Sequence, residues 1–292
     1  MPVRFEINKG MLQVRQSFDF PAVYLDHWAV RRFSSNEEEG QRFLRALRAS
    51  GGALVVSHTN LAEVTGPEDP RHADETAAFF EGVLPNIYFA MFDVQQAMNQ
   101  EKHPRDIDVR LKAPPDVELL MTVGRERPDD FRPFTIANII KVITKHRDRV
   151  GATWHESNQK LADHINEVRR NAETVRQAKR FSGHPTHVPT LAVMQELLRP
   201  VFLDRTLSID RNDAGDIHHA ILSIVYCDYA LLDGKWEDLH KRMKRRFTEL
   251  GRTIRTATVF SGRRHGVERF LEAIEDAGTP TTVREGILDT RE

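Results

Sequence analysis

The chain has 292 residues and a formal net charge of −1, because 42 Lys and Arg residues balance 43 Asp and Glu residues. This balance excludes a protein that coats a nucleic-acid duplex with positive charge, although it allows a local basic strip. The 40% hydrophobic content is enough for a full core. Its single cysteine, short apolar runs and charged start predict a cytoplasmic protein without disulfides or membrane spans.

The N-terminal part of the chain predicts an extension, a strand and a helix. Residues 1–20 are expected to form the extension. The segment 21–30, PAVYLDHWAV, is aromatic and β-branched, and predicts a strand that ends at Asp26. A helix is expected over 34–52, because a serine or asparagine can cap its start and three glutamates favour its positive end.

The next two elements repeat this order. The run GALVVS at 52–57 is continuously apolar, which is typical of a parallel strand covered on both faces. The segment 58–67, HTNLAEVTGP, predicts a short helix that carries Glu63. Residues 21–70 therefore alternate strand and helix, the pattern of a parallel sheet with crossover helices.

The middle of the chain, 71–190, is dominated by helical periodicity and predicts a large helical insertion. Its segment 155–181 is long and polar, with a narrow apolar stripe. This segment is either a solvent-facing helix or a surface for a partner. The stripe residues are Leu161, Ile165 and Val168, and further amphipathic helices are expected at 74–84, 116–124 and 134–147.

The last third returns to alternating elements. Strands are expected at 229–232 and 255–261, and each follows or precedes an amphipathic helix. Residues 191–280 then form the second part of the domain, followed by a tail at 281–292. The predicted fold class is α/β, with a central parallel sheet flanked by helices and the helical insertion between its two parts.

Acidic residues recur where these strands end. Asp26 ends the first strand, Asp233 follows the strand at 229–232, and Glu63 lies on the helix after the second strand. Asp213 and Asp216 begin the helix before 229–232. Sites in parallel sheets form at the carboxyl ends of strands, so these carboxylates are expected to converge. Mg²⁺ or Mn²⁺ would offset their repulsion, and could activate water against a phosphodiester.

This ordered set of motifs resembles the PIN domain family of metal-dependent ribonucleases. The matching stretches are VYLD, SHTNLAE, NDAGDIHHA, YCDYALLD and the closing ATVFSGRRHGVERFLEAI. They cover roughly residues 20–66 and 190–275. The resemblance implies a Mg²⁺- or Mn²⁺-dependent endoribonuclease that cleaves single-stranded RNA with metal-activated water. It implies catalytic roles for Asp26, Glu63, Asp213, Asp216 and Asp233, of which Asp26, Glu63, Asp216 and Asp233 would ligate metal.

Two positions depart from the family pattern, in which Thr or Ser often stands near the first acid and before the last one. Here His27 and Leu232 occupy these places. The departure supports an alternative, a catalytically degenerate PIN-like module for binding or assembly. A phosphohydrolase acting on small nucleotides is a weaker alternative, because the chain has no Gly-rich phosphate loop.

Each acid also has a structural interpretation, and Asp26 could be an acid at the surface end of its strand. Asp213 or Asp216 could simply cap or charge the start of its helix. Asp233 could be a turn residue, since it precedes a glycine. Glu63 could lie on an exposed helix turn.

Basic residues near the predicted site suggest where a nucleic acid would lie. Arg263, Arg264 and His265 follow the last strand and are expected nearest to it, and His219 is expected to line the cleft. The basic stretches at 169–180 and 240–247 could equally be solvated helix faces. RNA is the expected partner, and an antitoxin, another protein or a second copy of the chain are further candidates. A toxin, a defence nuclease and an RNA-processing enzyme would share these features.

Overall fold

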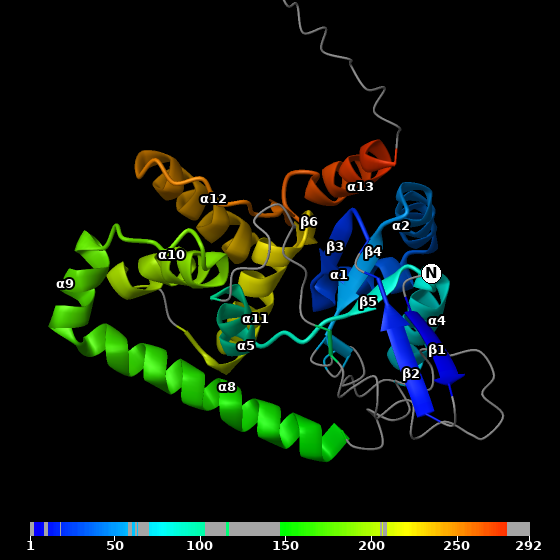
Figure 1. Cartoon of the computed structure of the whole chain (residues 1–292), viewed down its shortest axis with the longest axis horizontal. Coiled ribbons are helices and arrows are strands. Elements are labelled where there is room, and N and C mark those ends of the chain that lie inside the picture. The colour runs from blue at the N-terminus through cyan, green and yellow to red at the C-terminus, as the bar shows by residue number, and fades with distance from the viewer. Residues whose placement is uncertain are drawn as a thin grey trace, which may run out of the picture.

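The computed structural model describes residues 3–8, 11–17, 19–57, 60–61, 63, 70–102, 115–116, 147–204, 206 and 209–278 (Figure 1). The predicted helices at 116–124 and 134–147 and the tail at 281–292 lie almost entirely outside these residues. None of the described helices is long and apolar enough to cross a membrane.

A five-stranded parallel sheet forms the centre of the protein, and it confirms the predicted α/β fold class. Its strand order is β5-β4-β3-β6-β7. Side chains from β3 and β4 are buried in both directions, because helices cover both faces of the sheet. The strands are β3 (Ala22–Leu25), β4 (Ala53–Val56), β5 (Ile87–Phe89), β6 (Tyr229–Leu231) and β7 (Thr258–Phe260).

Strand β5 was not predicted from the sequence. It lies inside the segment 71–190 that was predicted to be helical, and it pairs in parallel with β4 at the edge of the sheet. Its short run of buried apolar residues has no helical or strand period of its own, so periodicity cannot distinguish the two states. Part of the expected insertion therefore completes the central sheet.

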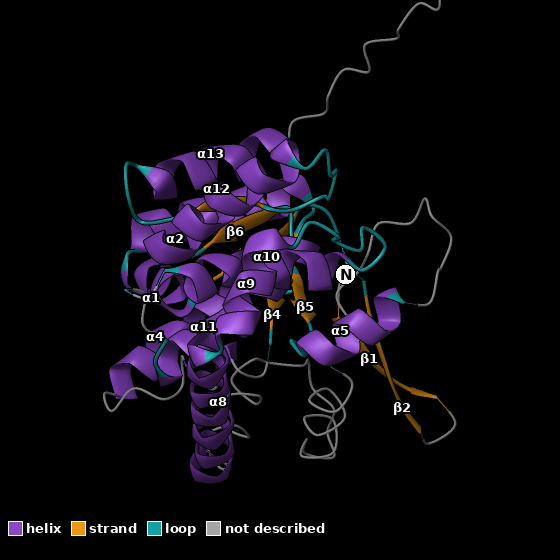
Figure 2. Cartoon of the chain, turned by 90° about the vertical axis from the view of Figure 1, so that its left-hand side faces the viewer, coloured by secondary structure: helices purple, strands orange, loops and turns teal. Residues whose placement is uncertain are grey.

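Two sets of helices cover the two faces of the sheet (Figures 1 and 2). One face packs against α1 (His27–Ser35), α2 (Glu37–Ser50), α4 (Pro70–Val83) and α13 (Gly266–Ala277). The other packs against α5 (Val94–Glu101), α8 (Arg147–Arg170), α10 (Pro189–Leu203), α11 (Arg211–Tyr226) and α12 (Gly234–Glu249).

The order of the strands reverses between β3 and β6. From β3 the chain crosses to β4 through α1 and α2 on one face, whereas from β6 it crosses to β7 through α12 on the other face. The helices that follow β3 and β6 thus leave the sheet in opposite directions. Such a reversal opens a crevice at the carboxyl ends of the two strands, where ligands of α/β proteins commonly bind.

The expected N-terminal extension contains an antiparallel hairpin, β1 (Val3–Asn8) and β2 (Met11–Gln16). The side chain of Gln16 attaches it to the edge strand β5. Its amide nitrogen donates to the carbonyl of Phe89 at 2.8 Å, and its amide oxygen accepts from the Phe89 N–H at 3.1 Å. The side chain thereby satisfies backbone groups that an edge strand leaves unpaired.

The long polar segment forms two helices, because the chain breaks at Asn171. This residue caps α9 (Ala172–Arg180) through its side-chain oxygen. Of the expected apolar stripe on α8, Ile165 is buried, while Leu161 and Val168 are half-buried. Among the side chains described from residue 155 onward, α8 therefore buries only a narrow face, and it packs along α11.

Candidate active site

Asp26 lies where β3 ends and α1 begins. Its carboxylate accepts a hydrogen bond from the His27 N–H at 2.8 Å and so caps α1. Its own N–H donates to the carbonyl of Leu231 on the neighbouring strand at 3.0 Å. Asp26 is 8% exposed. These bonds fix the carboxylate at the mouth of the crevice between β3 and β6.

Asp233 occupies the equivalent position after β6. It is the residue that precedes α12, but its carboxylate makes no capping bond and is exposed. The backbone N–H of Asp233 lies near enough to the Asp26 carboxylate to lower the pKa of Asp26. The two acids therefore lie at the carboxyl ends of adjacent strands.

Asp216 on α11 and Glu63 on the segment after β4 bring two further carboxylates to the crevice. Burial, followed by the charges of Asp216 and Asp233, raises the pKa of Asp26 to about 7. Burial, then Asp26 and Asp216, raises the pKa of Glu63 to about 8. Burial, Asp233 and Asp213 raise the pKa of Asp216 to about 6. Each carboxylate thus stands close enough to others to resist ionisation.

The four acids fit a hard divalent cation in chemical type. Within the described part of the chain, no three His, Cys, Asp or Glu side chains already lie close enough together to hold one ion. Mg²⁺ commonly binds through one or two carboxylates and keeps several waters, so a looser carboxylate set is compatible with it. Repulsion among these acids is what a bound cation would relieve.

Asp213 has a structural role at the start of α11. It forms a capping box with Asp210: each side chain accepts from the other residue's backbone N–H, at 2.9 and 3.1 Å. It also forms an ion pair with Lys235. Asp213 still raises the pKa of Asp216, so it lies beside the crevice while being committed to other partners.

Lys235 and Trp236 lie beside Asp216, and neither residue was predicted from the sequence to be part of the site. The Lys235 charge lowers the pKa of Asp216, and its ammonium lies 5.7 Å from the centre of the Trp236 ring. The buried indole N–H of Trp236 has no hydrogen-bond partner at bonding distance among the described residues, yet it lies near enough to Asp216 to lower its pKa. The feature of the sequence that could have indicated both residues is their position just after Asp233 and Gly234.

A buried polar network supports the acids from behind. Asn60 accepts hydrogen bonds from Ser57 through its side-chain oxygen, from the N–H at 3.1 Å and from the hydroxyl at 2.9 Å. The Asn60 amide nitrogen therefore points the other way, and it donates to the Tyr24 hydroxyl at 2.8 Å. Burial raises the pKa of Tyr24 well above its usual value, so this hydroxyl remains a donor.

This network determines the tautomer of His219. The Tyr24 hydroxyl lies 2.5 Å from Nδ1 of His219, and the Asn60 amide nitrogen lies 3.3 Å from the same atom. Both neighbours donate, so Nδ1 accepts and the proton of a neutral ring sits on Nε2. That Nε2 lies 4.0 Å from a Glu63 carboxylate oxygen. The chain of donors and acceptors thus ends with an N–H directed at the acidic crevice.

His219 is only 3% exposed, so the structure places it behind Glu63 rather than on an open surface. Phe92 and Tyr24 pack around its ring. The sequence predicted that His219 lines the cleft, and the structure places its Nε2 4.0 Å from Glu63. The sequence did not indicate the partners that orient it, because Tyr24 and Asn60 lie far from it along the chain.

Arg263 lies directly over the start of α12. A side-chain carbon added to Gly234 would overlap Nε and Cζ of Arg263. The Arg263 guanidinium also pairs with Asp238 at 3.0 Å. Because Gly234 follows Asp233, this cation stands at the rim of the crevice. Arg264 and His265 are exposed and adopt positive φ values of 50° and 58° in the turn that leads to α13.

No protein-family model matches the chain, and comparisons with curated proteins and with solved structures found no match. The interpretation of the site therefore depends on its own geometry.

The two departures from the family pattern have different surroundings. Leu232 is buried in the core beneath α12, and its N–H donates to the Phe260 carbonyl at 2.9 Å. His27 lies half-buried beside Asp233, and burial together with Arg31 lowers its pKa. At these two positions, a buried alkyl group and an imidazole stand where the pattern has hydroxyl groups.

Proposed function

We propose that this protein is a metal-dependent endoribonuclease that cleaves single-stranded RNA, with its active site in the crevice between β3 and β6. The observation that carries the proposal is the convergence of Asp26, Glu63, Asp216 and Asp233. They come from four separate segments and raise one another's pKa or that of a neighbour. A folded protein that keeps repelling carboxylates at a strand-order reversal favours a cationic cofactor and an anionic substrate.

The acids and His219 would have different roles in the reaction, and the surroundings of each residue support its role. A bound Mg²⁺ or Mn²⁺ would supply charge neutralisation and activation of water for attack on the phosphodiester. Asp26, held by backbone bonds, would fix the cation in place, with Asp216 and Asp233 at its sides. Glu63, whose pKa is about 8, can hold or release a proton near neutral pH, and His219 limits its movement from behind.

Basic groups at the rim would position the RNA backbone. Arg263 lies against the start of α12, next to Asp233. Arg264 and His265 follow it on the exposed turn. Arginine contacts to phosphate orient a strand without selecting its sequence.

The proposal is tested by incubating a labelled single-stranded RNA with the protein in Mn²⁺ and in EDTA. We expect cleavage by the wild type in Mn²⁺ alone, and no cleavage by the Asp26→Asn variant. Asp74→Asn, an exposed acid on α4, is the matched control and should cleave normally. Full cleavage by Asp26→Asn would falsify the assignment.

A second function is favoured by the spacing of the acids, because no three metal-ligating side chains among the described residues lie close enough together to hold one ion, and by Leu232 before Asp233. In this alternative the crevice has lost catalysis and the protein is a binding or assembly module. The two functions differ in metal binding. Mn²⁺ should raise the melting temperature of the nuclease through Asp26, and should not do so for the module.

A further inference from the structure

Helix α9 is a fixed surface element that contributes nothing to the core. None of its residues is buried. Asn171 caps its start, and Arg199 on α10 donates to the carbonyls of Ala178 and Lys179 near its end, at 3.0 and 3.3 Å. Specific hydrogen bonds at both ends therefore hold this exposed helix in one position.

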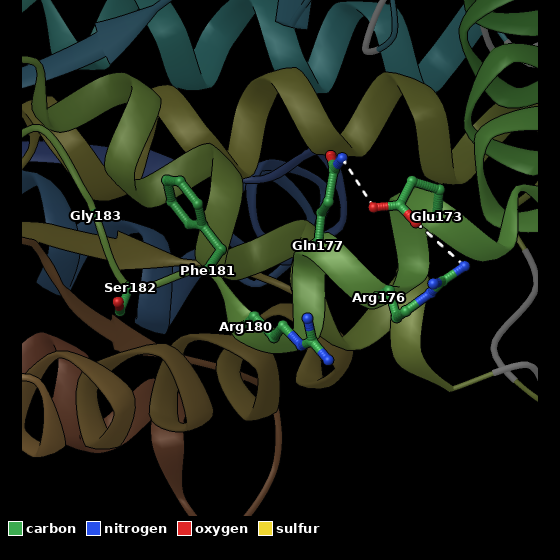
Figure 3. Close-up of a pocket in the computed structure, with 7 residues that line it drawn as sticks. All are labelled: Glu173, Arg176, Gln177, Arg180, Phe181, Ser182 and Gly183. Carbon is green, nitrogen blue, oxygen red and sulfur yellow. Dashed lines mark hydrogen bonds and ion pairs between the residues drawn. The ribbon is translucent and has the colours of Figure 1, made fainter.

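An open pocket of about 470 Å³ lies along α9 and the residues that follow it (Figure 3). A smaller pocket of about 190 Å³ lies between α9 and α10 and shares Gln177 and Phe181 with the first. The larger volume is in the range of small-ligand sites. Its polar and charged lining comes from Glu173, Arg176, Gln177, Arg180 and Ser182.

Phe181 gives this pocket an aromatic surface. It is 37% exposed, and Phe20 is the other large hydrophobic side chain that the structure describes as exposed. The Phe181 ring contacts His184 edge-on at a centroid distance of 4.9 Å, and His184 contacts Phe247 on α12 at 5.6 Å. Phe181 is therefore an exposed ring supported by edge-to-face contacts through the buried rings of His184 and Phe247. Exposed aromatic rings are the surfaces on which nucleic-acid bases stack.

The charge around Phe181 is strongly positive. Between residues 169 and 180 the chain carries five basic residues and one acid, whereas the whole chain has a net charge of −1. Arg176 pairs with Glu173 at 3.1 Å but remains 61% exposed. Clustered arginines beside an exposed aromatic ring complement a polyanion with planar groups.

Helix α12 connects this pocket to the acidic crevice. Asp233 precedes its first residue. Phe247, near its other end, contacts His184, which in turn contacts Phe181. The helical rise places these two residues roughly 20 Å apart along the axis. Four exposed basic residues lie between them on α12, at Lys241, Arg242, Lys244 and Arg245.

We propose that the pocket along α9 binds single-stranded RNA at a distance from the acids. A base would stack on Phe181, and Arg176 and Arg180, which both lie along α9 on the same side of this ring (Figure 3), would contact the phosphates that follow it. Gln177 and Glu173 line the same pocket, where the Gln177 amide donates to the Glu173 carboxylate at 3.3 Å. The choice of RNA rests on the proposed function, whereas the pocket itself is defined independently of the acids.

The test is fluorescence anisotropy with a labelled oligouridylate of about 20 nucleotides, in EDTA so that no cleavage occurs. Phe181→Ala and Arg180→Ala should each weaken binding roughly tenfold. Phe181→Tyr should bind like the wild type. Arg45→Ala removes an exposed arginine from α2 on the other face of the sheet and should also bind normally. Circular dichroism establishes that each variant is folded.

Salt dependence separates the two roles. Arg180→Ala should reduce the slope of log affinity against log salt by about 0.7, the value for one lost phosphate contact on a single strand. Phe181→Ala should leave this slope unchanged, because stacking releases no counterions. Affinities of Phe181→Ala and Arg180→Ala equal to that of Arg45→Ala would overturn the proposal, and would leave an acidic protein surface as the occupant to test.

The outcome of this binding experiment does not depend on whether the nuclease proposal is correct. Asp26→Asn should bind the oligonucleotide as tightly as the wild type in EDTA while losing cleavage in Mn²⁺. Loss of binding only in the variants at Phe181 and Arg180 supports the pocket even if the wild type does not cleave. Cleavage that is unaffected by these variants on RNA of every length would instead remove the pocket from the reaction.

Discussion

The backbone N–H of Asp233 lies near enough to the Asp26 carboxylate to lower its pKa, so two neighbouring strands at the reversal of the sheet share one acidic corner. No positively charged side chain is among the causes that set the pKa of Asp26 in the described part of the chain. Burial and the charges of Asp216 and Asp233 raise its pKa to about 7, and the bonds from the backbone offset only part of that rise. Repulsion among the ionised carboxylates at this corner therefore lowers the free energy of unfolding.

This repulsion makes stability depend on pH. The folded pKa values of Asp26, Asp216 and Glu63 lie above their usual values, so the folded state binds these protons more tightly than the unfolded chain does. Metal-free protein should therefore lose stability as the pH rises from about 4 to about 8, and level off above that. Urea unfolding across this range measures the slope.

Asp26→Asn should remove part of this slope. Asn can still cap α1, while the repelling charge is gone. We expect the variant to be about 1–3 kcal/mol more stable than the wild type at pH 8, since one pKa unit corresponds to about 1.4 kcal/mol, and nearly equal to it at pH 4. Asp74→Asn is the control. A destabilised variant at pH 8 would contradict the repulsion.

Metal binding should reverse the same effect. Mn²⁺ and protons compete for the carboxylates, so Mn²⁺ should raise the melting temperature more at pH 8 than at pH 6. With a hundredfold excess of metal over its Kd we expect a rise of about 5 °C or more. Differential scanning fluorimetry measures it. An equal rise in the double variant Asp26→Asn/Asp216→Asn would place the bound metal elsewhere.

Removing one hydroxyl should loosen the network behind Glu63. In Tyr24→Phe the donor to His219 Nδ1 and an acceptor for Asn60 are both lost. Leaving buried polar groups unpaired costs about 1–3 kcal/mol of unfolding free energy. Nitrogen-15 NMR should show His219 as the Nε2–H tautomer in the wild type and as a mixture in the variant. Tyr229→Phe is the control, and an unchanged tautomer in Tyr24→Phe would refute the derived network.

The close contact between Gly234 and Arg263 predicts that their substitutions are not additive. An alanine methyl at Gly234 would occupy the place of the Arg263 guanidinium and displace this flexible side chain. Gly234→Ala and Arg263→Ala should each reduce RNA affinity several-fold, and the double variant should lose no more than either one. Arg255→Ala, at the opposite end of the sheet, is the charge-matched control. Additive losses would show that Arg263 acts from another position.

Much of the central fold could be predicted because its signals are local. Short apolar and β-branched runs indicated β3, β4, β6 and β7. Asn36, one of the two caps expected for α2, accepts a hydrogen bond from the Glu39 N–H. Strand β5 was missed because three apolar residues carry no period, and because its place in the sheet depends on β4, which lies far back in the chain.

The site was predicted in part for the same reason. Carboxylates at strand ends follow from the sheet, so Asp26 and Asp233 could be placed. The orientation of His219 could not, because it depends on Tyr24 and Asn60, more than 150 residues away along the chain. Lys235 directly follows the Asp233-Gly234 pair, and only the fold shows that it reaches Asp213.

Helix α12 begins at the acidic corner, and Phe247 near its other end contacts His184 beneath Phe181. A helix of this kind does not stretch, so it acts as a ruler between the two places. If the end of an RNA strand is bound at Phe181 and the strand is cut beside Asp26, the distance from that end to the cut is the same in every molecule. The fragments released would then share one length, set by the number of turns in α12 and not by the sequence of the RNA.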